Sequence, residues 1–280
     1  MPRSFNRLRY ARLCDDRDPG LDGTADRGAD HVADRLYELR LDDRGRIDSV
    51  QPDSGAAIGP DDWDLAGDWL SPGGVDLQIN GALGLAFPDL TVADRDQLTT
   101  IGQFLRSQGV SAYLPTIVTT AVGKIHQAIG VIADYQREWE QTENQAADRS
   151  ADRAEIWGVH LEGPFLAPAK RGAHPESFLL PLNREQVLAV LGNRPEAAAQ
   201  VRLMTLAPEL DPTGAAINEL RSRGIVVSLG HSQATAAIAD AAFDRGATMV
   251  THAFNAMPSL HHREPEPERG LPDEPPKFQP

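Results

Sequence analysis

Three short stretches of the sequence carry side chains that could do chemistry together. Each begins with an apolar run typical of a β-strand and places an acid or a histidine where that strand ends, namely Glu162, His231 and His252. If the strands are parallel neighbours in a barrel, these ends meet at one mouth. A carboxylate and two imidazoles suit a divalent cation and leave a position for water, so the sequence predicts a metal site that activates water. The stretches are GVHLEGPF (158–165), SLGHSQA (228–234) and VTHAFNAM (250–257).

Taken singly, each of these residues would be an ordinary loop side chain, so the prediction depends on all three coming together. The single cysteine, Cys14, cannot supply a thiolate cluster, which leaves His, Asp and Glu as ligands. His160 lies two residues before Glu162 and faces the same side of its strand, where we expect it to fill the barrel interior.

The elements that must position this site alternate between strand and helix from Ser71 onward. Three expected helices end in a glycine that leads into an apolar strand, at Gly109, Gly224 and Gly246. Alternating βα units with buried strands predict a parallel sheet, and functional residues at several strand ends favour a TIM-type barrel over a doubly wound sheet. The expected strands are Val75–Ile79, Val110–Leu114, Ile156–Leu161, Val201–Leu206, Ile225–Leu229 and Thr248–Thr251. The expected helices include Thr91–Gln108, one with Ile125, Ile129 and Ile132 on a single face, Arg184–Leu191, Pro212–Arg223 and Ala234–Arg245.

The fold class expected is therefore α/β, a TIM-type barrel of the metal-dependent hydrolase kind, incomplete at about six of eight units, with a small N-terminal β-rich domain. The chain ends too soon after Val250 for two further units, and its last residues are rich in proline. We divide it into a β-rich domain over 1–70, a barrel over 71–264 and a disordered Pro-rich tail over 265–280. In the first domain, Leu36–Leu41 and Ile47–Val50 are expected to form a hairpin.

Composition limits the partners of the chain. The 280 residues carry a formal charge of −14, which argues against non-specific binding of nucleic acid. No apolar run is long enough to span a membrane, and residues 1–16 lack the apolar core of a secretory signal, so we expect a cytoplasmic protein. In this acidic field an anionic substrate would need a local basic pocket.

Several motifs together resemble one family. HLEGPF, KRGAH (170–174), LGHS, THAFNAM and HHREP (261–265) are similar in order and spacing to the N-acetylglucosamine-6-phosphate deacetylases of the amidohydrolase superfamily. The resemblance implies a metal-dependent barrel that carries a small β-sandwich domain, of which residues 1–70 would be part. It also implies hydrolysis of the N-acetyl group of N-acetylglucosamine 6-phosphate, giving glucosamine 6-phosphate and acetate in amino-sugar catabolism. It also implies a homodimer for the complete protein.

Carried over by residue, the resemblance makes Glu162, His231 and His252 the metal ligands. It implies a substrate pocket for an amino-sugar phosphate, with Arg263 meeting the phosphate across the dimer interface; the alternative for Arg263 is a surface ion pair with Glu264 or Glu266. The other residues that it assigns to substrate binding are Ala173, His174, Asn255 and Ala256.

The first barrel strand departs from the pattern of many amidohydrolases, which have His-x-His there for a second metal. This chain has Gln78 and Asn80 instead, and neutral amides are weak ligands for a transition metal. We therefore expect one divalent ion, Zn²⁺ or Fe²⁺, with Gln78 either positioning the water or substrate amide or making a hydrogen bond inside the barrel mouth.

The end of the chain departs further. The family's aspartate after the eighth strand, its general base, has no counterpart here, so no catalytic residue is assigned and impaired turnover is expected. Beyond Pro265 the sequence reads as a shifted frame or a truncated gene product. Two alternatives stay open: another amidohydrolase (dihydroorotase-like or an amino-acid deacylase), and a non-catalytic protein that binds metal or sugar phosphate.

Overall fold

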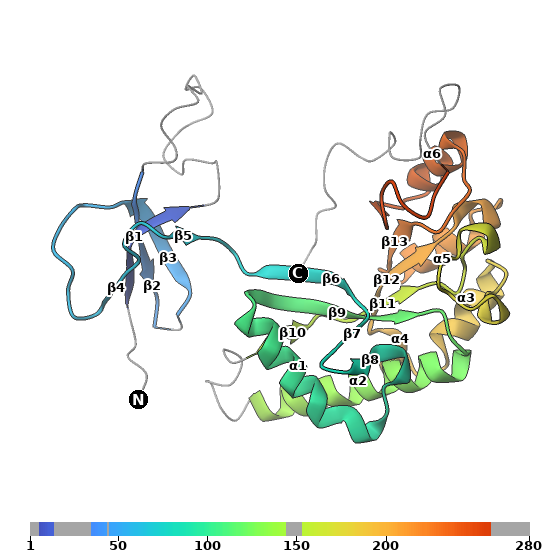
Figure 1. Cartoon of the computed structure of the whole chain (residues 1–280), viewed down its shortest axis with the longest axis horizontal. Helices are drawn as coiled ribbons and strands as arrows, with labels where there is room; N and C mark the ends of the chain where they lie inside the picture. Colours follow the sequence, from blue (N-terminus) through green and yellow to red (C-terminus); the bar gives the residue numbers. More distant parts are fainter. Residues whose placement is uncertain (1–5, 14–34, 44, 144–152, 259–280) are drawn as a thin grey trace. The chain divides into compact units, whose positions relative to one another are not determined.

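The computed structural model describes residues 6–13, 35–43, 45–143 and 153–258 (Figure 1). The chain separates into two compact units, residues 1–73 and residues 74–280. Arg263 and the predicted tail lie outside the described residues, as does the polar segment 15–31.

The first unit is a small mixed sheet with strand order β3-β2-β1-β4, and β5 also pairs with β1. The predicted hairpin is confirmed, because β2 and β3 pair antiparallel from Tyr37 opposite Pro52 to Leu41 opposite Ile47. Its buried apolar core contains Ala11, Tyr37 and Leu39. Because so small an apolar core contributes little stability, we expect polar interactions to contribute much of the stability of this unit. The strands are β1 (Arg7–Leu13), β2 (Tyr37–Leu41), β3 (Ile47–Pro52), β4 (Asp62–Asp64) and β5 (Trp69–Leu70).

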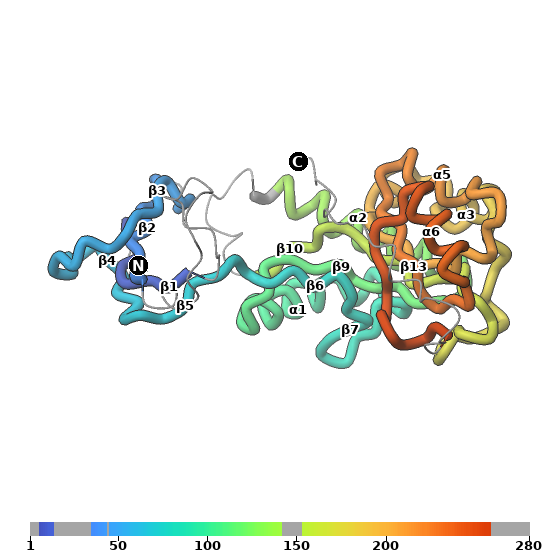
Figure 2. The backbone as a smooth tube through the Cα atoms, turned by 90° about the horizontal axis from the view of Figure 1, so that it is seen from above, coloured from blue at the N-terminus to red at the C-terminus, as the bar shows by residue number. Residues whose placement is uncertain are grey.

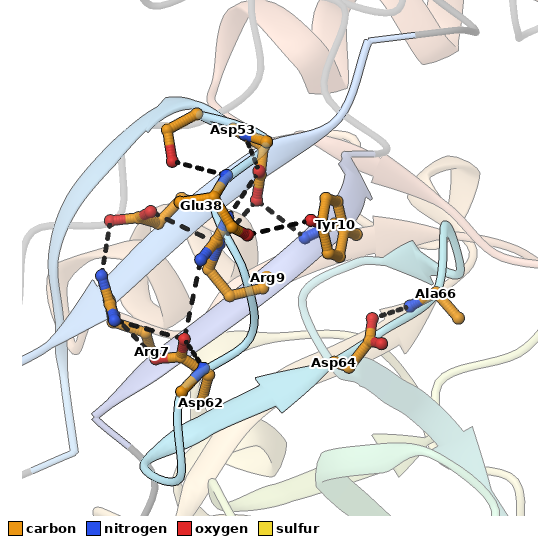
Figure 3. A network of polar contacts seen from close by, with 12 residues as sticks. Arg7, Arg9, Tyr10, Glu38, Asp53, Asp62, Asp64 and Ala66 are labelled. Atoms are coloured by element: carbon orange, nitrogen blue, oxygen red, sulfur yellow. Dashed lines mark hydrogen bonds and ion pairs between the residues drawn. The ribbon is translucent and has the colours of Figure 1, made fainter.

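A buried guanidinium holds this sheet together (Figure 3). The side chain of Arg9 on β1 is 1% exposed and donates two hydrogen bonds of 2.8 Å to the carboxylate of Asp53. Glu38 and Asp62 lie 3.4 and 3.6 Å from the same guanidinium. The hydrogen bond from Arg9, together with backbone donors at Gly55 and Tyr10, lowers the pKa of Asp53 well below its usual range in spite of burial. Arg9 thus joins three segments that are distant in the sequence.

The second unit contains six consecutive parallel strands in chain order, a curled half-barrel, and this confirms the predicted fold class. The tube colours of Figure 2 change in the same order from β6 through β9 to β13. Within the described residues, the first and last strands each pair along one side only. The strands are β6 (Gly74–Ile79), β9 (Val110–Val118), β10 (Glu155–Ile156) with β11 (Val159–Glu162), β12 (Val201–Leu206), β13 (Val226–Leu229) and β14 (Met249–Val250); β7 (Gly81–Ala82) and β8 (Leu85–Ala86) form a small hairpin.

The helices bury one face each against this sheet. Leu98, Ile101 and Leu105 of α1 are buried, as are Ile125 and Ile129 of α2, as their spacing predicts. Thr91 caps the turn that leads into α1, through a backbone and a side-chain hydrogen bond to Asp94 at 2.8 and 2.7 Å. The helices are α1 (Arg95–Ser107), α2 (Val122–Glu143), α3 (Arg184–Leu191), α4 (Pro195–Ala198), α5 (Ala215–Ser222) and α6 (Ala236–Asp244), with short 3₁₀ turns η1 (Phe87–Asp89), η2 (Val92–Asp94), η4 (Pro168–Lys170), η5 (Glu176–Phe178) and η6 (Pro208–Leu210).

Most predicted elements are confirmed, with differences at their ends. Gly109, Gly224 and Gly246 all have positive φ, at 83°, 74° and 100°, as a helix-ending glycine requires. The third strand is interrupted between β10 and β11 because Gly158 has a φ of 131° and sits against the backbone oxygen of Gln200.

Among the described residues, no helix combines the length and the apolar character needed to cross a bilayer.

We expect Asp53→Asn to destabilise the first unit by about 3 kcal/mol, because it leaves a buried guanidinium without its main partner. Hydrogen exchange at the amides of β1 and β2 measures this directly. The matched control is Asp89→Asn, which removes the exposed Asp89–Lys124 pair and should change stability by less than about 1 kcal/mol. Equal exchange rates in the two variants would contradict the assignment.

The same unit should lose stability in acid. The pKa of Asp53 and that of Asp62 are lowered in the folded chain, so their contribution is complete above the unfolded value of about 4 and disappears as the pH falls through the folded values. NMR amide signals of β1 and β2, followed from pH 6 to pH 2, should disappear in this range. In Asp53→Asn the dependence should be flatter.

Candidate metal centre

Glu162, His231 and His252 converge as the sequence predicts. The Nε2 atoms of His231 and His252 lie 3.0 and 2.8 Å from the same oxygen, Oε1 of Glu162. One ligand-type atom from each residue lies within 4.8 Å of the other two, so the group could hold a metal ion. Glu162 is 2% exposed at its side chain and His231 is 6% exposed, whereas His252 is 35% exposed and faces the open side.

Strand ends position these residues. Glu162 is the last residue of β11, and each histidine follows its strand by two residues, after Leu229 of β13 and Val250 of β14. Both histidines have left-handed backbones, with φ of 50° for His231 and 57° for His252. This conformation is uncommon for a residue with a β-carbon and costs free energy, so the surrounding structure must hold it.

The hydrogen-bonding roles at His231 fit a cation. Its Nδ1 lies 2.8 Å from the carbonyl oxygen of Lys170, which can only accept, so Nδ1 carries a proton. In the neutral ring, Nε2 then presents a lone pair to the Glu162 carboxylate, and two acceptors face one another at 3.0 Å. A proton or a metal cation between them removes this conflict, and a backbone carbonyl on the distal nitrogen is the usual partner of a metal-binding histidine.

The charges point the same way. Burial alone would raise the pKa of Glu162, but the hydrogen bond from His231 and the nearby imidazoles lower it to about 2. Burial alone would lower the pKa of His231, but the contacts with Glu162 and Lys170 raise it. The carboxylate is therefore ionised and attracts positive charge into the site.

His174, predicted to line the substrate pocket, lies beside this group. Its Nε2 is 3.9 Å from Oε1 of Glu162, and its ring packs edge-on against His231 with centroids 4.7 Å apart. Its Nδ1 contacts the hydroxyl of Thr119 at 2.8 Å, and that hydroxyl donates to the backbone oxygen of Glu162. Burial lowers the pKa of His174, so the ring stays neutral near pH 7.

The other residues predicted to bind substrate lie in three segments of the second unit. Ala173 directly precedes His174 and is exposed. Asn255 is exposed in the loop after β14, where its backbone N–H donates to the carbonyl of His252 at 2.7 Å, and Ala256 accepts from Ser232. Gln78 is half-buried on β6, and its side chain makes no hydrogen bond with any described residue.

Two supporting residues were missed in the sequence. Thr119 joins His174 to the Glu162 backbone, and its position just after β9 was the available signal. Lys170 supports the site from both ends: its carbonyl accepts from His231, and its Nζ donates to the carbonyl of Met257 at 2.8 Å. Backbone acceptors leave no pattern in a sequence, so the role of the Lys170 carbonyl could not be predicted.

His160 fills the interior as expected and also makes hydrogen bonds. It is 1% exposed, with Nδ1 at 3.1 Å from the carbonyl of Leu77 and Nε2 at 2.8 Å from the hydroxyl of Thr205. Burial lowers the pKa of His160 to about 4, so the ring is neutral.

Known proteins match both the sequence and the fold. The N-acetylglucosamine-6-phosphate deacetylase of Danio rerio is 37% identical over 196 residues, covering 70% of this chain and 45% of that protein. The N-acetylgalactosamine-6-phosphate deacetylase of Escherichia coli O157:H7 is 32% identical over 232 residues, covering 82% of this chain and 55% of that protein. No family model matches the chain.

Two solved structures of deacetylases also resemble this chain. The deacetylase of Pasteurella multocida superposes with a TM-score of 0.68 at 28% identity, over 92% of this chain and 59% of that one. A variant of the Mycobacterium smegmatis enzyme, solved in complex with N-acetyl-D-glucosamine-6-phosphate, superposes with a TM-score of 0.66 at 27% identity, over 96% of this chain and 60% of that one.

The parallel half-barrel matches the TIM-type barrels of the amidohydrolases, a class of metal-dependent hydrolases, and its strand ends bring together a carboxylate and two imidazoles that could hold a metal ion. Within that class, the chain is a homologue of the N-acetylglucosamine-6-phosphate deacetylases. It spans a little under half the length of the first curated relatives that it matches.

We expect Glu162→Gln to weaken binding of Zn²⁺ at least 100-fold, because it removes the charge that both imidazoles face. Isothermal titration at pH 7.5 measures this affinity. The matched control is Glu155→Gln on β10, where the exposed carboxylate accepts a hydrogen bond from Trp157. This substitution should leave the affinity unchanged. Equal affinities in the two variants would exclude Glu162 as a ligand.

Proposed function

We propose that the chain carries the metal-binding part of a deacetylase that hydrolyses the N-acetyl group of N-acetylglucosamine 6-phosphate, in amino-sugar catabolism. The observation that carries this proposal is the single buried carboxylate oxygen of Glu162 facing the Nε2 atoms of His231 and His252. Sequence identity with deacetylases of two amino-sugar phosphates supports the substrate class.

In this proposal Glu162, His231 and His252 hold one divalent ion, Zn²⁺ or Fe²⁺. When bound, the ion supplies Lewis acidity that activates water and polarises an amide carbonyl. The half-exposed His252 marks the side from which substrate would approach, since Glu162 and His231 are buried.

The proposed substrate contacts surround this group. His174 lies close enough to the cluster for its Nε2 to meet the acetyl carbonyl or the attacking water. Asn255 and Ala256 would bind the sugar hydroxyls or phosphate from the loop after β14, and Ala173 and Gln78 would complete the pocket. Arg263 would bind the phosphate through its paired N–H donors.

We further propose that this chain turns over slowly. Among the described residues, Glu162 is the one carboxylate in contact with the imidazoles, and it is engaged by both. A second carboxylate acting as general base would be worth about 10² to 10⁴ in rate. A chain that binds metal but hydrolyses little would behave as a sugar-phosphate-binding protein, which is the second candidate function.

The deciding experiment measures acetate release from N-acetylglucosamine 6-phosphate by the full chain loaded with Zn²⁺ or Fe²⁺. We expect detectable release, at least 100-fold below that of an active deacetylase assayed alongside, and none in Glu162→Gln. N-acetylgalactosamine 6-phosphate and N-acetyl amino acids, tested in parallel, separate the amino-sugar assignment from a general acylase. Binding of the sugar phosphate without release would establish the binding protein, and turnover of an acyl amino acid alone would contradict the proposal.

A further inference from the structure

Four buried polar side chains form a continuous hydrogen-bonded chain across the barrel interior. The Nε2 of His160 lies 2.8 Å from Oγ1 of Thr205, which lies 2.8 Å from Oγ1 of Thr251, which in turn lies 2.7 Å from Oγ of Ser228. His160, Thr205 and Ser228 are at most 1% exposed, and Thr251 is 7% exposed. The chain crosses β11, β12, β13 and the end of β14.

The direction of this chain is fixed at one end. The Leu77 carbonyl accepts from Nδ1 of His160, so in the neutral ring Nε2 is an acceptor and takes the hydroxyl proton of Thr205. Oγ1 of Thr205 is then free to accept from Thr251, and Thr251 can accept from Ser228. Each hydroxyl thus has one orientation, and such ordered chains strengthen their members.

The hydroxyl chain is linked to the candidate metal centre through the backbone at two points. Thr205 is the register partner of Glu162 on the neighbouring strand, and Thr251 directly precedes His252. His231 is oriented by the Lys170 carbonyl, but within the described part of the chain the Nδ1 of His252 has no hydrogen-bond partner. The orientation of His252 therefore depends on its backbone, which is left-handed and must be held by its neighbours.

Close packing leaves Thr251 little freedom. A β-carbon on Gly230 would lie 2.9 Å from Cβ of Thr251 and 3.0 Å from Cγ2 of Thr205, so both threonines pack closely against the backbone of Gly230. With its hydroxyl bonded on two sides, Thr251 is held in one rotamer, and the backbone that leads to His252 is held with it.

We propose that Thr205, at the centre of this hydroxyl chain, is a positioning residue that fixes Thr251 and through it His252, and so sets the affinity of the centre for a divalent cation. The inference rests on the proposed metal site. It assigns Thr205 no contact with substrate or metal, and a carboxylate and two imidazoles would still be present without it.

The test compares Thr205→Val, which keeps the shape but removes the hydroxyl, with Thr205→Ser, which keeps the hydroxyl. In the full chain we expect Thr205→Val to weaken Zn²⁺ binding 10- to 100-fold and Thr205→Ser to stay within about 3-fold of the unsubstituted chain. The control for loss of a hydroxyl away from the site is Thr99→Val, which breaks the 3.0 Å contact with Tyr135 and should not change the affinity. If Thr205→Val does not fold, Ser228→Ala replaces it, because Ser228 is the last member of the hydroxyl chain. We expect that substitution to weaken Zn²⁺ binding by about 3- to 10-fold.

A readout without metal accompanies the titration. Imidazole ¹⁵N spectra of the metal-free chain should show the Nδ1–H form of His160, and the Nε2 signal should shift in Thr205→Val and not in Thr99→Val. Unchanged Zn²⁺ affinity in Thr205→Val would overturn the inference while leaving the metal site intact. Equal weakening in Thr99→Val would reduce Thr205 to a stability residue and also overturn it. If the unsubstituted chain binds Zn²⁺ no better than Glu162→Gln, the proposed site fails first and the inference with it.

Discussion

A buried carboxylate oxygen that faces two imidazole nitrogens is the constraint on which the rest of the second unit depends. Oε1 of Glu162 is removed from water and lies within 3.0 Å of Nε2 on both His231 and His252. An ionised carboxylate in that position is stable only with positive charge beside it. The ends of the parallel strands place three ligand-type groups at one point. Both histidines need a strained, left-handed backbone to reach it.

The supporting contacts explain how a half-barrel can present such a centre. Lys170 orients His231 through its carbonyl, and Thr119 joins His174 to the Glu162 backbone. The hydroxyls of Thr205, Thr251 and Ser228 are hydrogen-bonded in series, and Thr251 directly precedes His252. Side-chain hydrogen bonds across parallel strands hold their ends in register where the backbone ladder is short, as it is at the two-residue strand β14.

The two units use different means of stabilisation. The second unit has an extensive apolar core between strands and helices, whereas the first has a small core and an ion-pair network around Arg9. The buried guanidinium of Arg9 favours the pairing that brings Glu38, Asp53 and Asp62 around it, because a buried charge without partners is costly. Stability of the first unit is therefore tied to carboxylate ionisation, and that of the second to apolar burial.

The sequence alone determined the alternation of strands and helices, the glycine ends of three helices and the three residues of the centre, because periodicity, left-handed caps and strand-end positions are local properties of the chain. It also carried the resemblance to the deacetylases in its motifs. Only the tertiary structure decided the break in the third strand at Gly158, the role of the Lys170 carbonyl and the partner of each hydroxyl around Thr205. These depend on which backbone atoms and side chains meet across strands that are far apart in the sequence, and residue types do not encode such contacts one by one.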